Sequence, residues 1–328
     1  MTVIKDVQVA GFPGVSLNNE TVQVIFVPEL GGKMVSLVRV ASGYEFLLQP
    51  QDVGRRYGRA TYGDRLENFD TSGFDECFPT ISACQYPLNP EVALPDHGEL
   101  WSVAWRVRKQ DECLYLEAMS RALHCRFRKR VRLDEDQVIL EYELANESDQ
   151  PVFYLWSAHP LLRVETGAEI TLPPEVNQMW IHWSRQVRLG NHGDLCCWPG
   201  AVLNGEHQDL STIRPWSSQT ADKLFTNRLK NGYCSLYHPE NDESITFQFD
   251  PQQVPYIGLW MCTGGWPETN ERGHLTVALE PCSGRPDALE EAYARGESAQ
   301  LKPREVRKWW LRLRIKQGRG AHSSTSNL

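Results

Sequence analysis

The chain has 328 residues and a formal net charge of -8 at pH 7, with 41% hydrophobic and 23% charged residues. This balance is typical of a folded globular protein, and the length allows a sizeable buried core. The negative charge argues against a nucleic-acid partner, because binding to the phosphate backbone needs a basic face. No apolar run approaches the roughly 20 residues of a membrane-spanning helix, so we expect a soluble protein without a membrane partner.

Nine cysteines give an odd count, and residues 1–6 lack the basic-then-apolar layout of a secretory signal. We therefore expect reduced thiols and a cytoplasmic location. The adjacent Cys196 and Cys197 lie near two histidines, but vicinal cysteines cannot easily aim both sulfurs at one tetrahedral zinc. Burial as small apolar side chains is the expectation for them, and we predict no metal site.

Apolar residues alternate with a period of two in four segments along the chain, at 22–26, 138–144, 245–249 and 309–315. Turn signals rich in glycine, asparagine and serine separate these segments. The one helix candidate is short and runs from Asp287 to Arg295, closed by Gly296. Many strands and few helices predict an all-β fold of packed antiparallel sheets, without βαβ units.

The segment from Arg126 to Arg132 is strongly basic, but its cationic residues alternate with Phe127 and Val131. This pattern favours a solvated strand face over a nucleic-acid site. No internal repeat or low-complexity linker divides the chain. We therefore predict a single domain over residues 1–316, followed by a polar tail over 317–328 that need not be ordered.

Three side chains in short segments marked by proline or glycine can carry chemistry. Glu280 ends an alternating strand, His97 lies in the turn 95–98, and His159 precedes Pro160. A carboxylate and two imidazoles suit proton transfer on a neutral substrate rich in hydroxyl groups. Each also has a purely structural explanation: a surface carboxylate for Glu280, a turn residue for His97 and a hydrogen-bonded core histidine for His159.

The segments 279–281 with 286–289, 157–160 and 95–98 resemble the aldose 1-epimerase, or galactose mutarotase, family. Residues 221–225 are similar to the stretch that carries a sugar-binding aspartate in that family, and residues 30–37 are similar to its opening hairpin. The likeness runs in the same order from about residue 20 to 315. The resemblance implies a large antiparallel β-sandwich with a sugar-binding cleft, and interconversion of the α and β anomers of an aldose without a cofactor.

The chemistry explains why these residue types are needed. Ring opening of a cyclic hemiacetal removes a proton from the C1 hydroxyl and delivers one to the ring oxygen, so one base and one acid suffice. The resemblance implies that Glu280 is the base and His159 the acid, while His97 and Asp222 bind and orient the sugar. We therefore expect a bell-shaped dependence of the rate on pH.

The chain departs from the family around residues 73–80. Relatives often carry an arginine just ahead of this segment to hold the sugar, and in this chain Asp75 and Glu76 occupy that neighbourhood. Carboxylates bind sugar hydroxyls and repel phosphate, so we predict that Asp75 binds substrate and that a hexose 6-phosphate is disfavoured. An anionic group on C6 stays open, because a nearby loop contains Arg55, Arg56, Arg59 and Arg65. Trp260 fits either an aromatic platform for the sugar or core packing.

Two other functions are compatible with the same fold. A non-catalytic carbohydrate-binding protein would keep the cleft, but the presence of Glu280 and His159 argues for the enzyme. A fragment of a lyase or glycoside hydrolase would bring a large helical domain, and no segment of this chain is long enough for one. The sequence leaves the identity of the sugar and the oligomeric state open.

Overall fold

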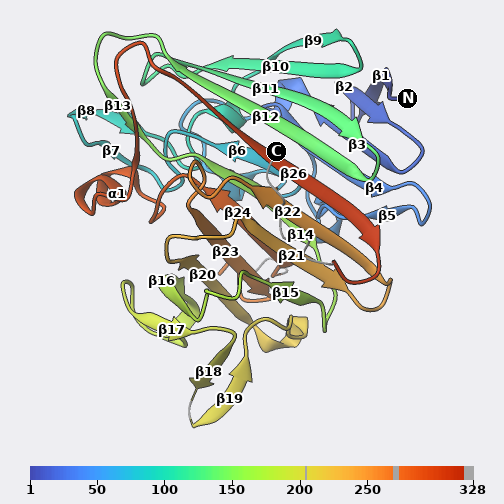
Figure 1. Ribbon diagram of the computed structural model, residues 1–328. Helices are drawn as coiled ribbons and strands as arrows, with labels where there is room; N and C mark the ends of the chain where they lie inside the picture. Colours follow the sequence, from blue (N-terminus) through green and yellow to red (C-terminus); the bar gives the residue numbers. More distant parts are fainter. Residues whose placement is uncertain (204, 269–272, 321–328) are drawn as a thin grey trace.

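The computed structural model describes residues 1–203, 205–268 and 273–320. Two large antiparallel sheets pack face to face, which confirms the predicted all-β sandwich (Figure 1). The larger sheet has twelve strands in the order β1-β2-β3-β4-β6-β14-β24-β23-β20-β16-β17, with β5 paired to β4. Its strands are β1 (Val3–Val9), β2 (Phe12–Asn18), β3 (Val22–Val27), β4 (Lys33–Arg39), β5 (Tyr44–Glu45), β6 (Phe74–Cys77), β14 (Ser157–Arg163), β16 (Gln178–Ser184), β17 (Leu195–Cys197), β20 (Thr220–Thr226), β23 (Tyr256–Thr263) and β24 (Leu275–Cys282).

The second sheet has eight strands in the order β15-β21-β22-β26-β12-β11-β10-β9. They are β9 (Arg106–Gln110), β10 (Cys113–Met119), β11 (Cys125–Asp134), β12 (Gln137–Asn146), β15 (Glu169–Thr171), β21 (Tyr233–His238), β22 (Glu243–Phe249) and β26 (Val306–Gln317). Small two-stranded sheets flank the sandwich and consist of β7 (Cys84–Tyr86) with β8 (Asn89–Leu94), β13 (Val152–Tyr154) with β25 (Ala299–Leu301), and β18 (Gly200–Leu203) with β19 (Glu206–Asp209).

Helical structure is confined to the short α1 (Leu289–Ala294) and single 3₁₀ turns in the part of the chain that the structure describes. The turns are η1 (Pro28–Leu30), η2 (Pro50–Val53), η3 (Leu66–Asn68), η4 (Leu100–Ser102), η5 (Arg185–Val187) and η6 (Trp216–Ser218). Helix α1 lies within the predicted segment 287–295, and Gly296 follows it with a φ of 70°. Among the described residues, no helix has the length and apolar character needed to cross a membrane.

The strands predicted from period-two alternation are confirmed as β3, β12, β22 and β26. Strand β26 extends through Gln317, the first residue of the predicted polar tail, and residues 321–328 lie outside the described part of the chain. All nine cysteines are free thiols. Cys196 is buried as expected, whereas Cys197 is exposed because successive residues of β17 point to opposite faces.

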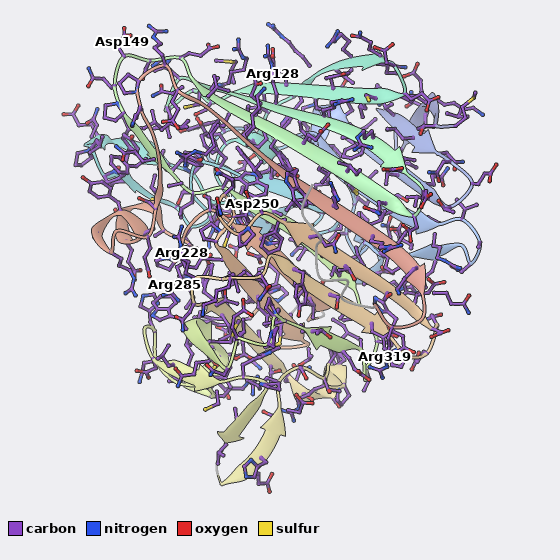
Figure 2. The ribbon with its side chains drawn as sticks, viewed as in Figure 1. Arg128, Asp149, Arg228, Asp250, Arg285 and Arg319 are labelled. Atoms are coloured by element: carbon purple, nitrogen blue, oxygen red, sulfur yellow. The ribbon has the colours of Figure 1, made fainter. Side chains whose placement is uncertain are left out.

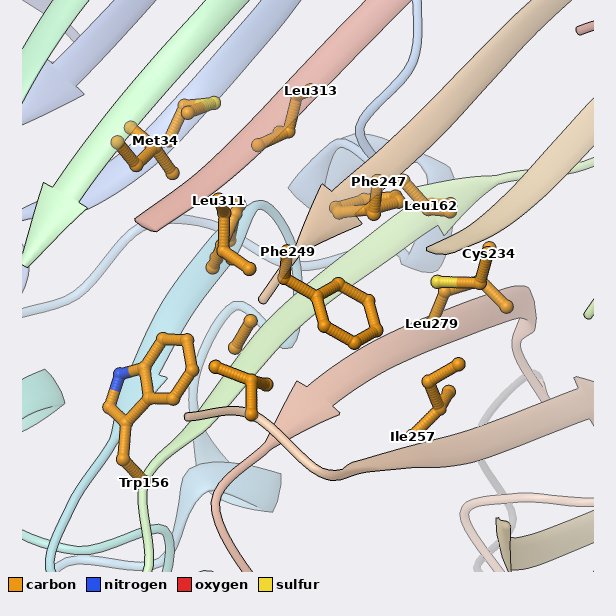
Figure 3. Close-up of a cluster of buried hydrophobic side chains, with 14 of the residues drawn as sticks. Met34, Trp156, Leu162, Cys234, Phe247, Phe249, Ile257, Leu279, Leu311 and Leu313 are labelled. Atoms are coloured by element: carbon orange, nitrogen blue, oxygen red, sulfur yellow. The ribbon is translucent and has the colours of Figure 1, made fainter. Parts of the chain in front are cut away.

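The hydrophobic core fills the space between the two sheets. Leu279 of β24 and Ile257 of β23 point from the larger sheet toward Leu311 of β26 and Phe247 of β22 in the smaller one (Figure 3). Because side chains alternate along a strand, the residues between these apolar ones point away from the core. The larger sheet therefore has a second face on which polar side chains can gather.

One charged residue breaks the predicted pattern of the basic strand. The arginines at 126, 128, 130 and 132 point outward from β11, as the alternation predicts, but Lys129 lies on the inner face and is buried. Its Nζ lies 3.0 Å from Oε1 of Glu76 and donates to the carbonyl of Gly32. Tyr142 and Trp156 also donate hydrogen bonds to the Glu76 carboxylate, at 3.0 and 2.9 Å. A saturated network thus balances the buried charges.

Replacing Lys129 with methionine leaves the Glu76 carboxylate buried without a counter-ion. We expect Lys129→Met to lower the free energy of unfolding by about 3–5 kcal/mol, the usual result of breaking a buried pair by removing one partner. Urea denaturation measures this change. The matched control is Lys308→Met, whose side chain is 72% exposed and pairs with Glu143 on the outer face. The control should lose less than about 1 kcal/mol, and equal losses in both variants would contradict the assignment.

Candidate functional site

The register of four neighbouring strands brings polar side chains together on the face of the larger sheet that points away from the core. Strand β14 pairs with β24 at Ser157–Cys282 and at Leu161–Ala278, and this register places His159 level with Glu280 between the two pairs. On its other side His159 pairs with Asp75 of β6, and Glu280 pairs with Gly258 of β23. Paired residues on adjacent strands share a face, so these four positions form one row across the sheet.

The loop with His97 is held against the end of this row by backbone contacts. The His97 amide donates to the carbonyl of Ile81 at 2.6 Å, and the Ile81 amide donates to the carbonyl of Asp287 at 2.9 Å. Gly98 has a φ of 73°, and a Cβ atom there would lie 2.1 Å from the Phe78 carbonyl oxygen, so this turn requires glycine. The segment 78–82 therefore joins the turn of His97 to the segment of Asp287.

A cavity of about 280 Å³ opens over this row. It is lined by residues from several strands and from the loops above them, including Arg65, Glu67, Thr71, Asp96, His97, His159, His182, Trp183, Lys223, Trp260, Trp266, Glu280 and Asp287. Among the described residues, six buried polar atoms of lining residues have no hydrogen-bond partner: Thr71 Oγ1, His97 Nδ1, His159 Nδ1, His182 Nδ1, Glu280 Oε1 and Asp287 Oδ1. Of these, His97 Nδ1 lies 3.0 Å from Oδ2 of Asp96 and can pair with it when the imidazole is protonated. Buried polar atoms are normally paired, so this cluster indicates a site for a polar ligand.

Lys223, which the sequence analysis did not single out, contacts the predicted base. It projects from β20, and its Nζ forms an ion pair with Oε2 of Glu280 and lies 3.7 Å from Oδ1 of Asp287. His182 Nε2 is 3.2 Å from the other oxygen of Asp287. Burial raises the pKa of Glu280, and the Lys223 charge opposes this rise. Burial alone would lower the pKa of Lys223, but Asp287 and Glu280 outweigh it and raise the pKa, so the lysine stays protonated.

The two histidines lie in different electrostatic environments although their ring centres are only 5.0 Å apart. Burial lowers the pKa of His159 well below its ordinary value, and the positive charges of His97 and Lys223 lower it further. At His97 burial acts in the same direction, but Asp96, 3.0 Å from Nδ1, outweighs it and raises the pKa. Of the two histidines, His97 therefore binds a proton more strongly than His159.

Three tryptophans form one wall of the cavity. Trp183 and Trp260 are stacked with ring centres 6.0 Å apart, and Trp266 stands perpendicular to Trp260 at 5.9 Å. The register of β16 against β20 shifts between Ile181 and Trp183, and this bulge lets both His182 and Trp183 line the cavity. Trp260 thus lies at the cavity wall, where an aromatic face can contact the apolar side of a sugar ring.

Two of the predicted substrate-binding residues do not line the cavity. Asp222 lies on the opposite face of β20 from Lys223, where it pairs with Arg188 and accepts a 2.6 Å hydrogen bond from Ser184. Alternation along the strand is the physical reason, since residues 222 and 223 must point to opposite sides. Asp75 is in the row beside His159, but its carboxylate is 3.1 Å from the buried Lys33. Burial raises the pKa of Asp75 to about 6, and Lys33 moderates that rise.

The arginine-rich loop contributes one side chain to the cavity lining, Arg65, which pairs with Glu67 at 2.9 Å. Arg55 donates to the Phe69 carbonyl at 2.6 Å, and Arg59 forms an ion pair with Glu29. Arg56 is exposed to solvent. The loop therefore reaches the rim of the site, with its charge there partly neutralised by Glu67.

A larger hollow of about 630 Å³ lies on the outer face of the eight-stranded sheet. Its charged side chains are largely paired with one another: Arg128, labelled in Figure 2, contacts Glu117 at 2.6 Å and Glu143 at 3.1 Å. Arg130 pairs with Glu141 at 2.9 Å. Because exposed pairs of this kind satisfy their own charges in solvent, the smaller cavity is the better candidate site. No cluster of three or more potential metal ligands occurs in residues 1–203, 205–268 or 273–320.

No family model and no curated protein sequence matches this chain. Among solved structures, a galactose mutarotase-like protein from Lactobacillus casei is 18% identical, with a TM-score of 0.67 over 92% of this chain and 100% of that one. A galactose mutarotase-like protein from Clostridium acetobutylicum is 11% identical, with a TM-score of 0.65 over 96% and 99% of the two chains. A galactose mutarotase related enzyme from Lactobacillus acidophilus is 16% identical, with a TM-score of 0.63 over 96% and 99%. The chain therefore has the galactose mutarotase-like β-sandwich fold.

Proposed function

We propose that this protein is an aldose 1-epimerase that interconverts the α and β anomers of a sugar by acid and base catalysis. The observation that carries the proposal is that His159 and Glu280, level in the register of β14 and β24, both line the cavity, and that His159 Nδ1 and Glu280 Oε1 have no hydrogen-bond partner among the described residues. Structures of the same fold named for galactose mutarotase support it. A sugar presents several hydroxyl groups, which match a lining of carboxylates and imidazoles.

Glu280 is the base in this proposal. Its Oε2 is occupied by Lys223, while Oε1 has no partner among the described residues and can accept the proton of the C1 hydroxyl. Burial raises the pKa of this carboxyl toward the working pH, which strengthens it as a base while the Lys223 charge keeps it ionised. Removal of the proton from the C1 hydroxyl and protonation of the ring oxygen break the bond between C1 and the ring oxygen, which opens the ring to the aldehyde. Rotation about the C1–C2 bond and reversal of both transfers then give the other anomer.

The acid is the histidine pair, with the proton resting on His97. His159 lies level with Glu280 in the register of β14 and β24, but burial lowers its pKa well below the ordinary value, whereas Asp96 favours the charged form of His97. We therefore modify the roles that the family resemblance implies: His97 supplies the proton for the ring oxygen, and His159 binds and orients the sugar beside it. The tryptophan wall contacts the C–H face of the ring.

Loss of the base provides the first test. Freshly dissolved α-glucose and α-galactose, with a 6-phosphate and a 6-sulfonate sugar in parallel, are followed by polarimetry and saturation-transfer NMR. We expect the wild-type protein to accelerate anomer equilibration for at least one sugar, and Glu280→Gln to lose about 10²–10⁴-fold in kcat. Full activity in folded Glu280→Gln would contradict the role of the carboxylate. Sugar binding without acceleration would identify a non-catalytic carbohydrate-binding protein instead.

The pH dependence tests the role of His97. The rate should require ionised Glu280 and protonated His97, which gives a bell-shaped profile whose alkaline limb belongs to the imidazolium. Asp96→Asn removes the carboxylate that raises the pKa of His97, so the alkaline limb should move to lower pH. The matched control is Asp149→Asn, an 80% exposed side chain paired with Arg304 and labelled in Figure 2. An alkaline limb that is unchanged in Asp96→Asn would show that His97 is not the acid.

A further inference from the structure

The two oxygens of the Glu280 carboxylate have different surroundings. Oε2 is bound by the ammonium group of Lys223, and Oε1 has no hydrogen-bond partner in the described residues. Both side chains are almost fully buried, with exposed fractions of 0% for Glu280 and 6% for Lys223. A buried carboxylate held by one oxygen presents the other in a fixed direction, which is the arrangement that a general base needs.

The contact spans an intervening strand. Lys223 lies on β20 and Glu280 on β24, with β23 between them. Gly258 of β23 pairs with Glu280, and a Cβ atom at this position would lie 2.9 Å from Oε2 of Glu280 and 3.2 Å from the ring of Phe225. Glycine inside a strand usually marks a close approach of another group. Because glycine has no side chain, the Glu280 carboxylate can occupy this space and reach Lys223 on β20.

The ammonium group itself is held on two sides. Asp287 lies 3.7 Å from the Lys223 Nζ, and His182 contacts the far oxygen of Asp287 at 3.2 Å. Two neighbouring carboxylates keep Lys223 charged, which excludes it as a nucleophile or a base at neutral pH. Its remaining role is electrostatic and geometric.

We propose that Lys223 is a positioning residue, which holds Glu280 by one carboxylate oxygen across Gly258 and leaves Oε1 as the atom that accepts the substrate proton. This inference rests on the proposed function and adds to it two residues that the base requires. Burial by itself favours the uncharged form of Glu280. Without the lysine, Glu280 and Asp287 would face each other in a buried site, and the base would be protonated over the neutral range.

The test measures the acid limb of the pH profile of kcat/KM, which reports the ionisation of the base. Lys223→Met should move this limb to higher pH by about 1–3 units and lower kcat at neutral pH. Lys223→Arg keeps the charge and should leave the limb close to that of the wild type. Gly258→Ala should lower kcat, because the added methyl group crowds Oε2 of Glu280. The matched controls are Lys308→Met and Gly200→Ala, since Gly200 has no atom within 4 Å of an added Cβ.

A measurement without turnover separates this inference from the proposed function. The Glu280 carboxyl is titrated by ¹³C NMR in glutamate-labelled protein, with its signal assigned by its loss in Glu280→Gln. A higher midpoint in folded Lys223→Met than in the wild type supports the role of the lysine, whether or not any aldose is turned over. If no aldose is turned over, only the proposal that the protein is an epimerase is contradicted. Equal midpoints in the two proteins would overturn the role of Lys223, whatever the activity.

Discussion

The alternation of side chains along the strands of the twelve-stranded sheet is the constraint on which the site depends. Each strand sends one residue into the core and the next into the cavity, as with Leu279 and Glu280 on β24 or Leu224 and Lys223 on β20. The core contacts between the two sheets (Figure 3), which fix the register of the sandwich, therefore also fix the polar row that contains His159 and Glu280. A shift of the strand register by one residue on β24 or β20 would place Glu280 or Lys223 in the core and a leucine in the cavity.

Three buried carboxylates of this fold have a buried lysine partner on another strand. Glu280 has Lys223, Asp75 has Lys33, and Glu76 has Lys129. Such pairs roughly balance the cost of removing two ions from water, whereas a single unpaired ion would be strongly destabilising. The pair at Glu280 differs from the one at Glu76: the core network uses both oxygens of Glu76, while Oε1 of Glu280 has no hydrogen-bond partner within the part of the chain that the structure describes. Asp75 Oδ1 also has no hydrogen-bond partner among the described residues, but Asp75 does not line the cavity, so Glu280 is the carboxylate of the three that is placed for proton transfer on a bound ligand.

Much of the architecture follows from local sequence patterns. Period-two alternation predicts β3, β12, β22 and β26, and the segments around His97, His159 and Glu280 identify three residues that the structure brings to one cavity. Such patterns report which face of a strand a residue occupies only when the strand boundaries are known. The family resemblance of residues 221–225 predicts Asp222 as a sugar-binding residue, but its neighbour Lys223 lines the cavity, and Asp222 pairs with Arg188 on the other face of β20. The close approach of Gly258 to Glu280 and the contact of Asp287 with Lys223 join segments that are distant in the sequence, so no local sequence pattern predicts them.

The most direct test of this account is the structure of Glu280→Gln with an aldose bound. We predict the anomeric hydroxyl within hydrogen-bonding distance of residue 280, the ring oxygen beside the His97–His159 pair and the C–H face of the sugar against Trp260. A sugar bound with C1 pointing away from residue 280, or bound in the hollow on the outer face of the eight-stranded sheet, would contradict the account.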